Sequence, residues 1–282
     1  MTRRRFYAPP EQFAPDGATV ALAREEASHL RNVLRLKAGD EVFVFDGEGR
    51  EYVCVVAASE SGGRARVERA TLEVRGQVEP ERAESPLDLT LAVALLKGEK
   101  FDLVVQKATE LGVWRIVPVV TKRSDVRVPR EGRNAAAATA DRVPRWRRIA
   151  LEAAKQSGRA RLPEIFTPVS FASLVEEDAG ALFKEGAGVA AATAADGQRL
   201  LFTERGGRGL AETAKEWREE EKMRPAKLTA LVGPEGGWDD EEIAEAVAAG
   251  WLAVTFGGRV LRAETAAIVI TGLLQHLCGD LV

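Results

Sequence analysis

Two glycine-rich segments near the C-terminal end of the sequence constrain the fold more than any other feature. Gly233-Pro-Glu-Gly-Gly237 follows the apolar run 227–232, and Phe256-Gly-Gly258 ends the apolar run 252–256. A helical pattern succeeds each of them, so both are expected to be strand-to-helix turns. In open α/β sheets, such turns lie at the carboxyl ends of the strands, where ligands bind. The two turns therefore predict an α/β domain with one small-molecule site between them.

The sequence from Leu87 onward alternates strand and helix patterns. Strands are predicted over 87–96, 114–120, 186–193, 200–203, 227–232 and 252–256, and helices over 101–111, 146–157 and 263–277 and from Asp239 onward. This alternation predicts a mostly parallel sheet that is covered by helices on both faces. The last helix is apolar on most faces, which predicts that it is buried, with a second subunit as a candidate for its cover.

The N-terminal part has a different pattern. Short elements are predicted at 25–34 (helix) and at 41–46, 50–56 and 64–74 (strands), with a glycine-containing turn between the first two strands. Alternating β-branched and aromatic residues across such a turn are typical of a hairpin. Residues 75–86 are polar, acidic and contain proline, which predicts a linker. We expect a small β-rich domain over 1–74, this linker, and the α/β domain over 87–282.

Charge is distributed unevenly along the chain, although the net charge is only -3. Between residues 121 and 161 there are twelve Lys or Arg and four acids, whereas between residues 201 and 250 there are twelve acids and seven bases. Such segregation allows a mildly acidic protein to present one basic face to a polyanion.

Several classes of protein are disfavoured by what the sequence lacks. Cys54 and Cys278 are far apart, and with only His29 and His276 beside them they predict neither a metal site nor a disulfide framework. No secretory signal and no stretch of about 20 apolar residues is present, so we expect a cytoplasmic protein with no membrane segment. The phosphate-loop and dinucleotide-binding patterns are also missing.

The first turn has the composition of a loop that binds ligands through its backbone. Pro234 fixes its own backbone torsion, while Gly236 and Gly237 adopt conformations closed to other residues and allow a ligand to approach closely. Asp239 and Glu242 have the spacing of a capping box at the start of the next helix. An ordinary strand-to-helix turn is the alternative interpretation.

The second turn adds charge. Arg259 and Arg262 precede the last helix, where the helix dipole disfavours a cation. Their position suggests an anionic partner, and solvated surface arginines are the alternative.

Taken together, these residues resemble a known family, the bacterial 16S ribosomal RNA uridine-N3 methyltransferases of RsmE type, which belong to the SPOUT superfamily. The matching motifs are the Arg-rich start, residues 29–40 with Asp46 and Gly47, residues 96–100, 106–112 and 152–157, and both glycine-rich turns. The resemblance covers nearly the whole chain. One departure is Gly258, where the family often has proline.

The resemblance implies a fold and a cofactor. It implies an N-terminal PUA-like RNA-binding β-barrel, a C-terminal SPOUT α/β domain with a deep trefoil knot, and a homodimer. The knotted loops would hold S-adenosylmethionine in a bent form, largely through backbone groups. The residues expected to bind this cofactor are Thr203, Glu204, Leu231, Gly233, Glu235, Gly236, Gly237, Phe256, Gly257, Val260 and Leu261.

The implied reaction is methylation of uridine N3 in 16S rRNA, in the 30S subunit, with U1498 as the family's target. We expect Arg262 to stabilise the deprotonated uracil, because a cation beside the carbonyls promotes loss of the N3 proton. Glu264 or Thr265 would orient it. The residues expected to contact RNA are Arg3, Arg4, Arg5, Arg31, Arg35, Lys97, Lys122 and Arg123.

Three alternatives remain open at this point: a non-catalytic RNA-binding protein with the same fold, a SPOUT methyltransferase with another RNA target, and a small-molecule or nucleotide-processing α/β enzyme. The intact glycine-rich turns argue against the first alternative. The missing phosphate-loop and dinucleotide patterns argue against the third.

Overall fold

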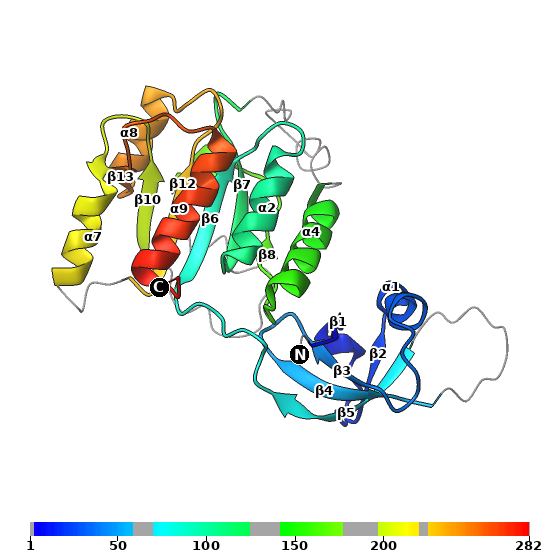
Figure 1. Cartoon of the computed structure of the whole chain (residues 1–282). Coiled ribbons are helices and arrows are strands. Elements are labelled where there is room, and N and C mark those ends of the chain that lie inside the picture. The colour runs from blue at the N-terminus through cyan, green and yellow to red at the C-terminus, as the bar shows by residue number, and fades with distance from the viewer. Residues whose placement is uncertain (1–2, 59–69, 125–141, 177–196, 220–224, 282) are drawn as a thin grey trace. The chain divides into compact units, whose positions relative to one another are not determined.

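The computed structural model describes residues 3–58, 70–124, 142–176, 197–219 and 225–281. Its contacts divide the chain into two units, and each is described by itself. Unit 1 consists of Met1–Glu84 and Leu151–Leu162, and unit 2 consists of Ser85–Ala150 and Pro163–Val282. Figure 1 shows the elements of both units coloured in chain order.

Unit 1 is built on a five-stranded sheet in the order β1-β3-β4-β5-β2. Its strands are β1 (Arg5–Tyr7), β2 (Thr19–Leu22), β3 (Glu41–Phe45), β4 (Glu51–Val56) and β5 (Ala70–Val78), and its short helical elements are η1 (Pro10–Gln12), α1 (Arg24–Ser28) and the π-helix η2 (His29–Val33). The predicted hairpin is confirmed, because β3 and β4 pair antiparallel from Glu41 with Val55 to Phe45 with Glu51. Among the described residues no ladder joins the edge strands β1 and β2, and closure into a barrel stays a prediction.

The core of unit 1 lies between this sheet and the helical segment α1–η2. Phe6, Leu22, Leu30 and Val44 are fully buried there, since the alternation of apolar residues along each strand points one side chain in two to the same face. The predicted helix over 25–34 is confirmed, with its second half wound as a π-helix.

The predicted linker over 75–86 begins later than its composition indicated. Strand β5 continues to Val78, where it pairs with Glu51 of β4. In addition, unit 1 includes residues 151–162, the C-terminal half of α4 (Arg142–Ser157) and the residues after it. No pattern in the sequence indicated this second contribution, because the contacts that make it join residues about 150 positions apart.

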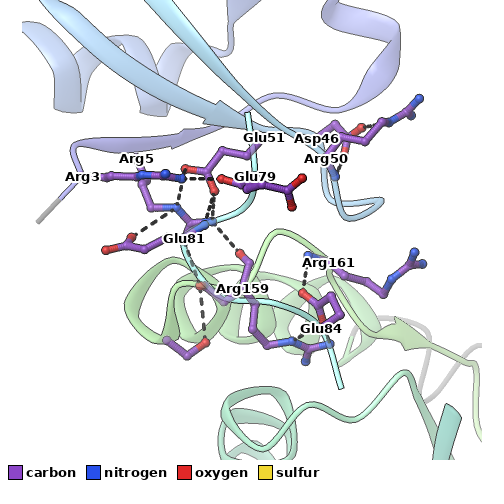
Figure 2. A network of polar contacts seen from close by, with 12 residues as sticks. Arg3, Arg5, Asp46, Arg50, Glu51, Glu79, Glu81, Glu84, Arg159 and Arg161 are labelled. Carbon is purple, nitrogen blue, oxygen red and sulfur yellow. Dashed lines mark hydrogen bonds and ion pairs between the residues drawn. The ribbon is translucent and has the colours of Figure 1, made fainter. Parts of the chain in front are cut away.

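Figure 2 shows the buried polar network that joins these segments of unit 1. Arg5 is almost fully buried and forms two hydrogen bonds with the Glu51 carboxylate, at 3.3 and 3.2 Å. The same guanidinium donates to the carbonyl oxygen of Arg159 at 2.9 Å, just beyond the end of α4. Arg159 in turn forms a buried ion pair with Glu84 at 2.8 Å. Two arginines thus fasten residues 151–162 to the sheet of unit 1.

Unit 2 is built on an eight-stranded sheet. Its strands are β6 (Asp88–Ala94), β7 (Arg115–Val120), β8 (Glu164–Ile165), β9 (Val169–Ser170), β10 (Gln198–Phe202), β11 (Arg208–Gly209), β12 (Lys227–Val232) and β13 (Leu252–Thr255). Its helices are α2 (Lys100–Glu110), the first half of α4, α5 (Phe171–Glu176), α7 (Leu210–Glu219), α8 (Asp240–Ala248) and α9 (Ala263–Cys278).

The strand order is β11-β13-β10-β12-β6-β7-β8, with β9 also on β7, and every pairing in this sheet is parallel. The predicted parallel sheet is therefore confirmed. The strand predicted over 186–193 lies outside the described residues.

Helices cover both faces of this sheet, as its continuously apolar strands require. Successive residues of β12 alternate between the two layers: Leu228, Ala230 and Val232 pack into the core with α2, α4, α7 and α9, whereas Leu231 packs with α5 and α8. Within the first layer, α9 lies against α2 and over β12 and β6, as Figure 1 shows. The side of α9 that packs on α2, β12 and β6 is therefore buried within the same chain.

Strand β13 is bordered on both sides by strands that follow each other in sequence. Residues 200–202 of β10 pair with 252–254, and residues 208–209 of β11 pair with 254–255 from the other side. The connection 203–207 therefore crosses β13 in close contact. A Cβ atom on Gly207 would lie 2.7 Å from the carbonyl carbon of Val254 and 2.9 Å from the amide nitrogen of Thr255. Only glycine fits at this crossing.

The buried network of unit 1 predicts a large effect of Arg5→Met on stability. Removing one partner of a buried ion pair leaves an uncompensated charge, which costs about 3–5 kcal/mol. We expect the lower end of that range, because Arg3 also pairs with Glu51, at 3.2 Å. The free energy of unfolding in a urea titration measures the loss.

The double variant Arg5→Met/Glu51→Leu should recover at least half of that loss, because it removes both charges together. Arg4→Met is the control, since Arg4 is exposed, and it should change the free energy of unfolding by less than about 0.5 kcal/mol. Equal stability of Arg5→Met and the control would contradict the structural role of the network.

Candidate functional site

A cavity of about 350 Å³ opens at the carboxyl ends of β10, β12 and β13 in unit 2. Its walls come from the segments that follow these three strands, from the start of α2 and from the first turns of α9. The lining residues are Lys100, Phe202, Thr203, Glu204, Val232, Gly233, Pro234, Glu235, Thr255, Phe256, Gly257, Gly258, Arg259, Val260, Leu261, Arg262, Ala263, Ala266 and Ile270. The structure therefore brings both glycine-rich turns into one cavity.

The first turn is held in place by a tryptophan. The Trp238 indole donates from Nε1 to the carbonyl oxygen of Phe202 at 2.8 Å, which ties the turn to the end of β10. A Cβ atom on Gly233 would lie 2.8 Å from this indole, so glycine is needed there for packing. Gly237 has a positive φ of 70°, which glycine adopts without strain.

The predicted capping box at the start of α8 is confirmed. Asp239 accepts from the amide of Glu241, and the Glu242 carboxylate accepts from the amide of Asp239 at 3.3 Å. Glu242 also accepts from the amide of Lys122 at 2.8 Å, so the cap fastens the end of β7 to α8. The hydrogen bond from Lys122 is the largest cause of a lowered Asp239 pKa. The first turn is thus rigid at both of its ends.

Two buried polar atoms at or next to the cavity have no hydrogen-bond partner among the described residues. Thr203, whose hydroxyl Oγ1 is one of them, lines the cavity and is 7 % exposed. The other is Oε2 of Glu264, on the first turn of α9, where the residue is 8 % exposed. Because buried polar groups are costly when unpaired, these two atoms are suited to a polar ligand.

The second turn contributes an open, charged wall. Arg262 is the N-cap residue of α9 and its side chain makes no capping hydrogen bond. Arg259, Val260 and Arg262 are exposed, with Val260 83 % exposed. A Cβ on Gly257 or Gly258 would meet no atom within 4 Å, so these glycines leave open space rather than packing tightly.

Lys100, which is not among the residues expected to bind the cofactor or to act in catalysis, also lies at the cavity. Lys100 is the first residue of α2, and its ammonium forms an ion pair with Glu235 of the first turn. This hydrogen bond is the largest cause of a raised Lys100 pKa. Lys100 lies 133 residues before Gly233, the first residue of the first turn, and its motif, 96–100, gave no indication of where it would be placed.

Most of the residues expected to bind the cofactor line this cavity, and three do not. The side chain of Leu231 packs on the other face of the sheet, because it alternates with Val232 along β12. Gly236 lies against Arg123, and Gly237 lies against the Glu204 carboxylate. Of the two proposed catalytic residues, Arg262 lines the cavity and Glu264 is buried next to it.

The residues expected to contact RNA differ from one another in burial and in their ion pairs. The structure buries Arg5 in the network of Figure 2, and it holds Arg3 half-buried against Glu51 and the carbonyl oxygen of Glu79. These two guanidinium groups are therefore engaged within unit 1. Arg4 and Arg35 are exposed and Arg31 is half-buried, in unit 1, and Lys97 is exposed in unit 2.

Lys122 and Arg123 are exposed as well, and both form ion pairs with Asp239, at 3.1 and 3.2 Å. Exposed pairs of this kind contribute little to stability and exchange readily with other anions.

In the described part of the chain, no group of three His, Cys, Asp or Glu residues is arranged to hold a metal ion. None of the helices described is both long and apolar enough to cross a membrane.

Comparison with known proteins gives consistent matches over both units. A family model for an RNA methyltransferase domain matches residues 83–275, and one for an RNA methyltransferase PUA domain matches residues 22–68. The chain is similar to the ribosomal RNA small subunit methyltransferase E of Synechocystis sp., with 32% identity over 97% of this chain and 77% of the relative.

Two solved structures are similar over the whole chain. One is a ribosomal RNA small subunit methyltransferase E from Neisseria gonorrhoeae bound to S-adenosylmethionine, with 29% identity, a TM-score of 0.77 and 100% of both chains covered. The other is a putative methyltransferase from Legionella pneumophila in complex with the same cofactor, with 30% identity, a TM-score of 0.75, and 99% and 100% of the two chains covered.

The crossing of residues 203–207 over β13 predicts the effect of Gly207→Ala. A Cβ atom at 2.7 Å from backbone must displace the segment that forms one wall of the cavity, which costs about 1–3 kcal/mol. Thermal unfolding should show a lower midpoint for this variant. Gly258→Ala is the matched control, because its Cβ would meet no atom within 4 Å and should leave the midpoint nearly unchanged. A Gly207→Ala midpoint equal to the control would refute the close crossing.

Proposed function

The chain belongs to the family of ribosomal RNA small subunit methyltransferases of type E, and from that premise we propose that it methylates N3 of a uridine in 16S rRNA. S-adenosylmethionine is the methyl donor of this family. The observation that carries the proposal is the single cavity shared by both glycine-rich turns, at the carboxyl ends of β10, β12 and β13. We further propose that the substrate is the 30S subunit and that U1498 is the target.

The residues of the cavity fit this cofactor. Its volume of about 350 Å³ lies within the range of about 300–1,000 Å³ that is usual for small-molecule sites. Gly233 and Gly257 present backbone groups without side chains. The Thr203 hydroxyl, which is bonded to none of the described residues, offers a hydrogen bond inside the cavity. We propose that Thr203, Glu204, Gly233, Glu235, Phe256, Gly257, Val260 and Leu261 hold S-adenosylmethionine, with Gly236 and Gly237 shaping the turn.

We propose that the chain of unit 2 is knotted, as the resemblance implies. Support comes from the crossing of residues 203–207 over β13, since the chain then leaves β13 at Phe256 close to that crossing. True knots are rare in proteins, and contacts between neighbouring strands alone do not require one. A PUA-like barrel in unit 1 and a homodimer belong to the same proposal.

The chemistry needs loss of the N3 proton and in-line attack on the methyl carbon. N3 is a poor nucleophile while protonated, so a cation beside the uracil carbonyls lowers the barrier by favouring the deprotonated base. We assign this role to Arg262, which lines the cavity with its guanidinium exposed. We assign the orientation of Arg262 to Glu264, which lies two positions further along the chain and whose buried Oε2 has no hydrogen-bond partner among the described residues.

For the RNA we propose contacts from Arg4, Arg31, Arg35, Lys97, Lys122 and Arg123. Arg3 is a weaker candidate and Arg5 is left out, because their guanidinium groups are used within unit 1. Phosphate contacts by the remaining residues would give an affinity that falls steeply with salt.

Titration calorimetry with S-adenosylmethionine tests the cofactor first. We expect one site per chain, followed by transfer of a labelled methyl group to 30S subunits that lack the modification. Fully modified 30S subunits are the control and should accept no methyl group. Absence of cofactor binding would refute the proposal, and binding without transfer to any rRNA would favour a non-catalytic RNA-binding protein.

Thr203→Val should weaken S-adenosylmethionine binding. The substitution keeps the shape of the side chain and removes the hydroxyl, which has no hydrogen-bond partner in the described part of the chain. The loss is therefore one hydrogen bond to the cofactor, about 1 kcal/mol or a roughly fivefold higher Kd. Thr213→Val on α7 is the matched control, because its hydroxyl is bonded to the carbonyl oxygen of Gly209 outside the cavity. An unchanged Kd for Thr203→Val would exclude the hydroxyl from the cofactor site.

Arg262→Ala should reduce single-turnover methylation by about 100-fold or more, because a preorganised charge at the reacting base is lost. Calorimetry should show that the cofactor still binds. A rate equal to that of the wild type at saturating cofactor would remove Arg262 from the chemistry.

A further inference from the structure

Two cationic side chains, those of Lys100 and Arg262, lie at the N-termini of two helices that border the same cavity. Lys100 is the first residue of α2, and Arg262 is the N-cap of α9. Both line the cavity, and α2 and α9 pack against each other. A helix N-terminus disfavours a cation in its first turn, so each of these positions costs stability unless an anion lies close.

Two carboxylates of the protein, those of Glu235 and Glu264, act on Lys100. Glu235 is ion-paired with Lys100, and the charge of Glu264 also acts on Lys100. Both raise the Lys100 pKa, whereas Arg262 lowers it. Glu264 is buried, and its Oε2 has no hydrogen-bond partner in the described part of the chain. This carboxylate oxygen beside Lys100, Glu235 and Arg262 can thus accept a hydrogen bond from a donor of the ligand.

The chemistry of the acceptor matches two cations rather than one. N3 of uracil lies between two carbonyl carbons, so the negative charge left by the N3 proton spreads over two oxygens. A single guanidinium next to one carbonyl leaves the other oxygen unpaired. Stabilisation of a developing charge by preorganised donors is usually the largest contribution to catalysis.

We propose, on the basis of the proposed function, that Lys100 is a second catalytic cation, which moves from Glu235 to the uracil carbonyl oxygen that Arg262 does not reach. The N3 proton leaves to solvent water, and the N3 electron pair forms the bond to the methyl carbon. The carbon–sulfur bond breaks in the same step and leaves a neutral thioether.

Glu235 has a definite part in this exchange. As the partner of Lys100 before the RNA binds, it holds the ammonium at the cavity wall in an ion pair. The side chain of Lys100 is 40% exposed, so its ammonium can leave the carboxylate without crossing a packed interior. When Lys100 moves, the Glu235 carboxylate is left to solvent water, which can reach it because its side chain is 21% exposed.

The test is Lys100→Met, which keeps the length of the side chain and removes its charge. Single-turnover methylation of 30S subunits at saturating cofactor should fall by about 100-fold or more near neutral pH. The pH profile separates this role from a structural one. Without the cation, the apparent pKa of the acceptor N3 rises by about 1–3, so the rate continues to increase with pH beyond the point where the wild type levels off.

Lys107→Met is the matched control. Lys107 lies on the same helix, has a similarly exposed side chain (37%), and is paired with Glu110 outside the cavity. Its substitution should leave the rate and the pH profile unchanged. Lys100→Arg should restore part of the rate, because it restores the charge, and this rescue shows that the loss in Lys100→Met does not come from misfolding.

Two results would overturn the inference while leaving the proposed function intact. A higher Kd for S-adenosylmethionine with an unchanged rate at saturation would place Lys100 on the cofactor's carboxylate. Weaker binding of 30S subunits with an unchanged rate at saturation would make it a phosphate contact. Absence of methyl transfer by the wild type is a different outcome, because it refutes the proposed function together with the inference.

Discussion

The crossing of residues 203–207 over β13 is the constraint on which the rest of unit 2 depends. It is set by two parallel ladders, one on each side of β13, and by a glycine where the two backbones touch. Because the crossing lies at Val254 and Thr255, the segment after β13 begins next to the segment after β10. The first turn completes the enclosure, since Trp238 ties it to Phe202. A cavity walled by backbone follows directly from these contacts.

The charges at this cavity are placed by secondary structure. Parallel strands direct their carboxyl ends, and the helices that follow them direct their N-termini, to the same edge of the sheet. The backbone dipoles at this edge therefore favour anions, and the cavity lining adds the cations Lys100, Arg259 and Arg262 together with the carboxylates Glu204 and Glu235. A site of this kind suits a reaction in which negative charge develops on the acceptor.

Local patterns in the sequence predicted the elements well, because they depend on neighbouring residues. The hairpin over 41–56, the parallel sheet and the capping box at Asp239 all follow from spacing. Spacing does not predict that residues 151–162 belong to unit 1. That placement depends on contacts with the pair of Arg5 and Glu51, which lie about 100 positions or more away in sequence. The burial of Arg5 in the Arg-rich start is hidden for the same reason, because an arginine in a buried ion pair and a surface arginine look alike in sequence. Lys100 and Gly207 owe their importance to contacts made only once the chain has folded.

The central claim is the identity of the methylated atom. It is tested most directly by mass spectrometry of the nucleosides released from 16S rRNA after unmodified 30S subunits have been incubated with the protein and S-adenosylmethionine. The account predicts one 3-methyluridine per 16S rRNA, absent when the cofactor is left out. A methyl group on the ribose, on uracil C5 or on another base would contradict it.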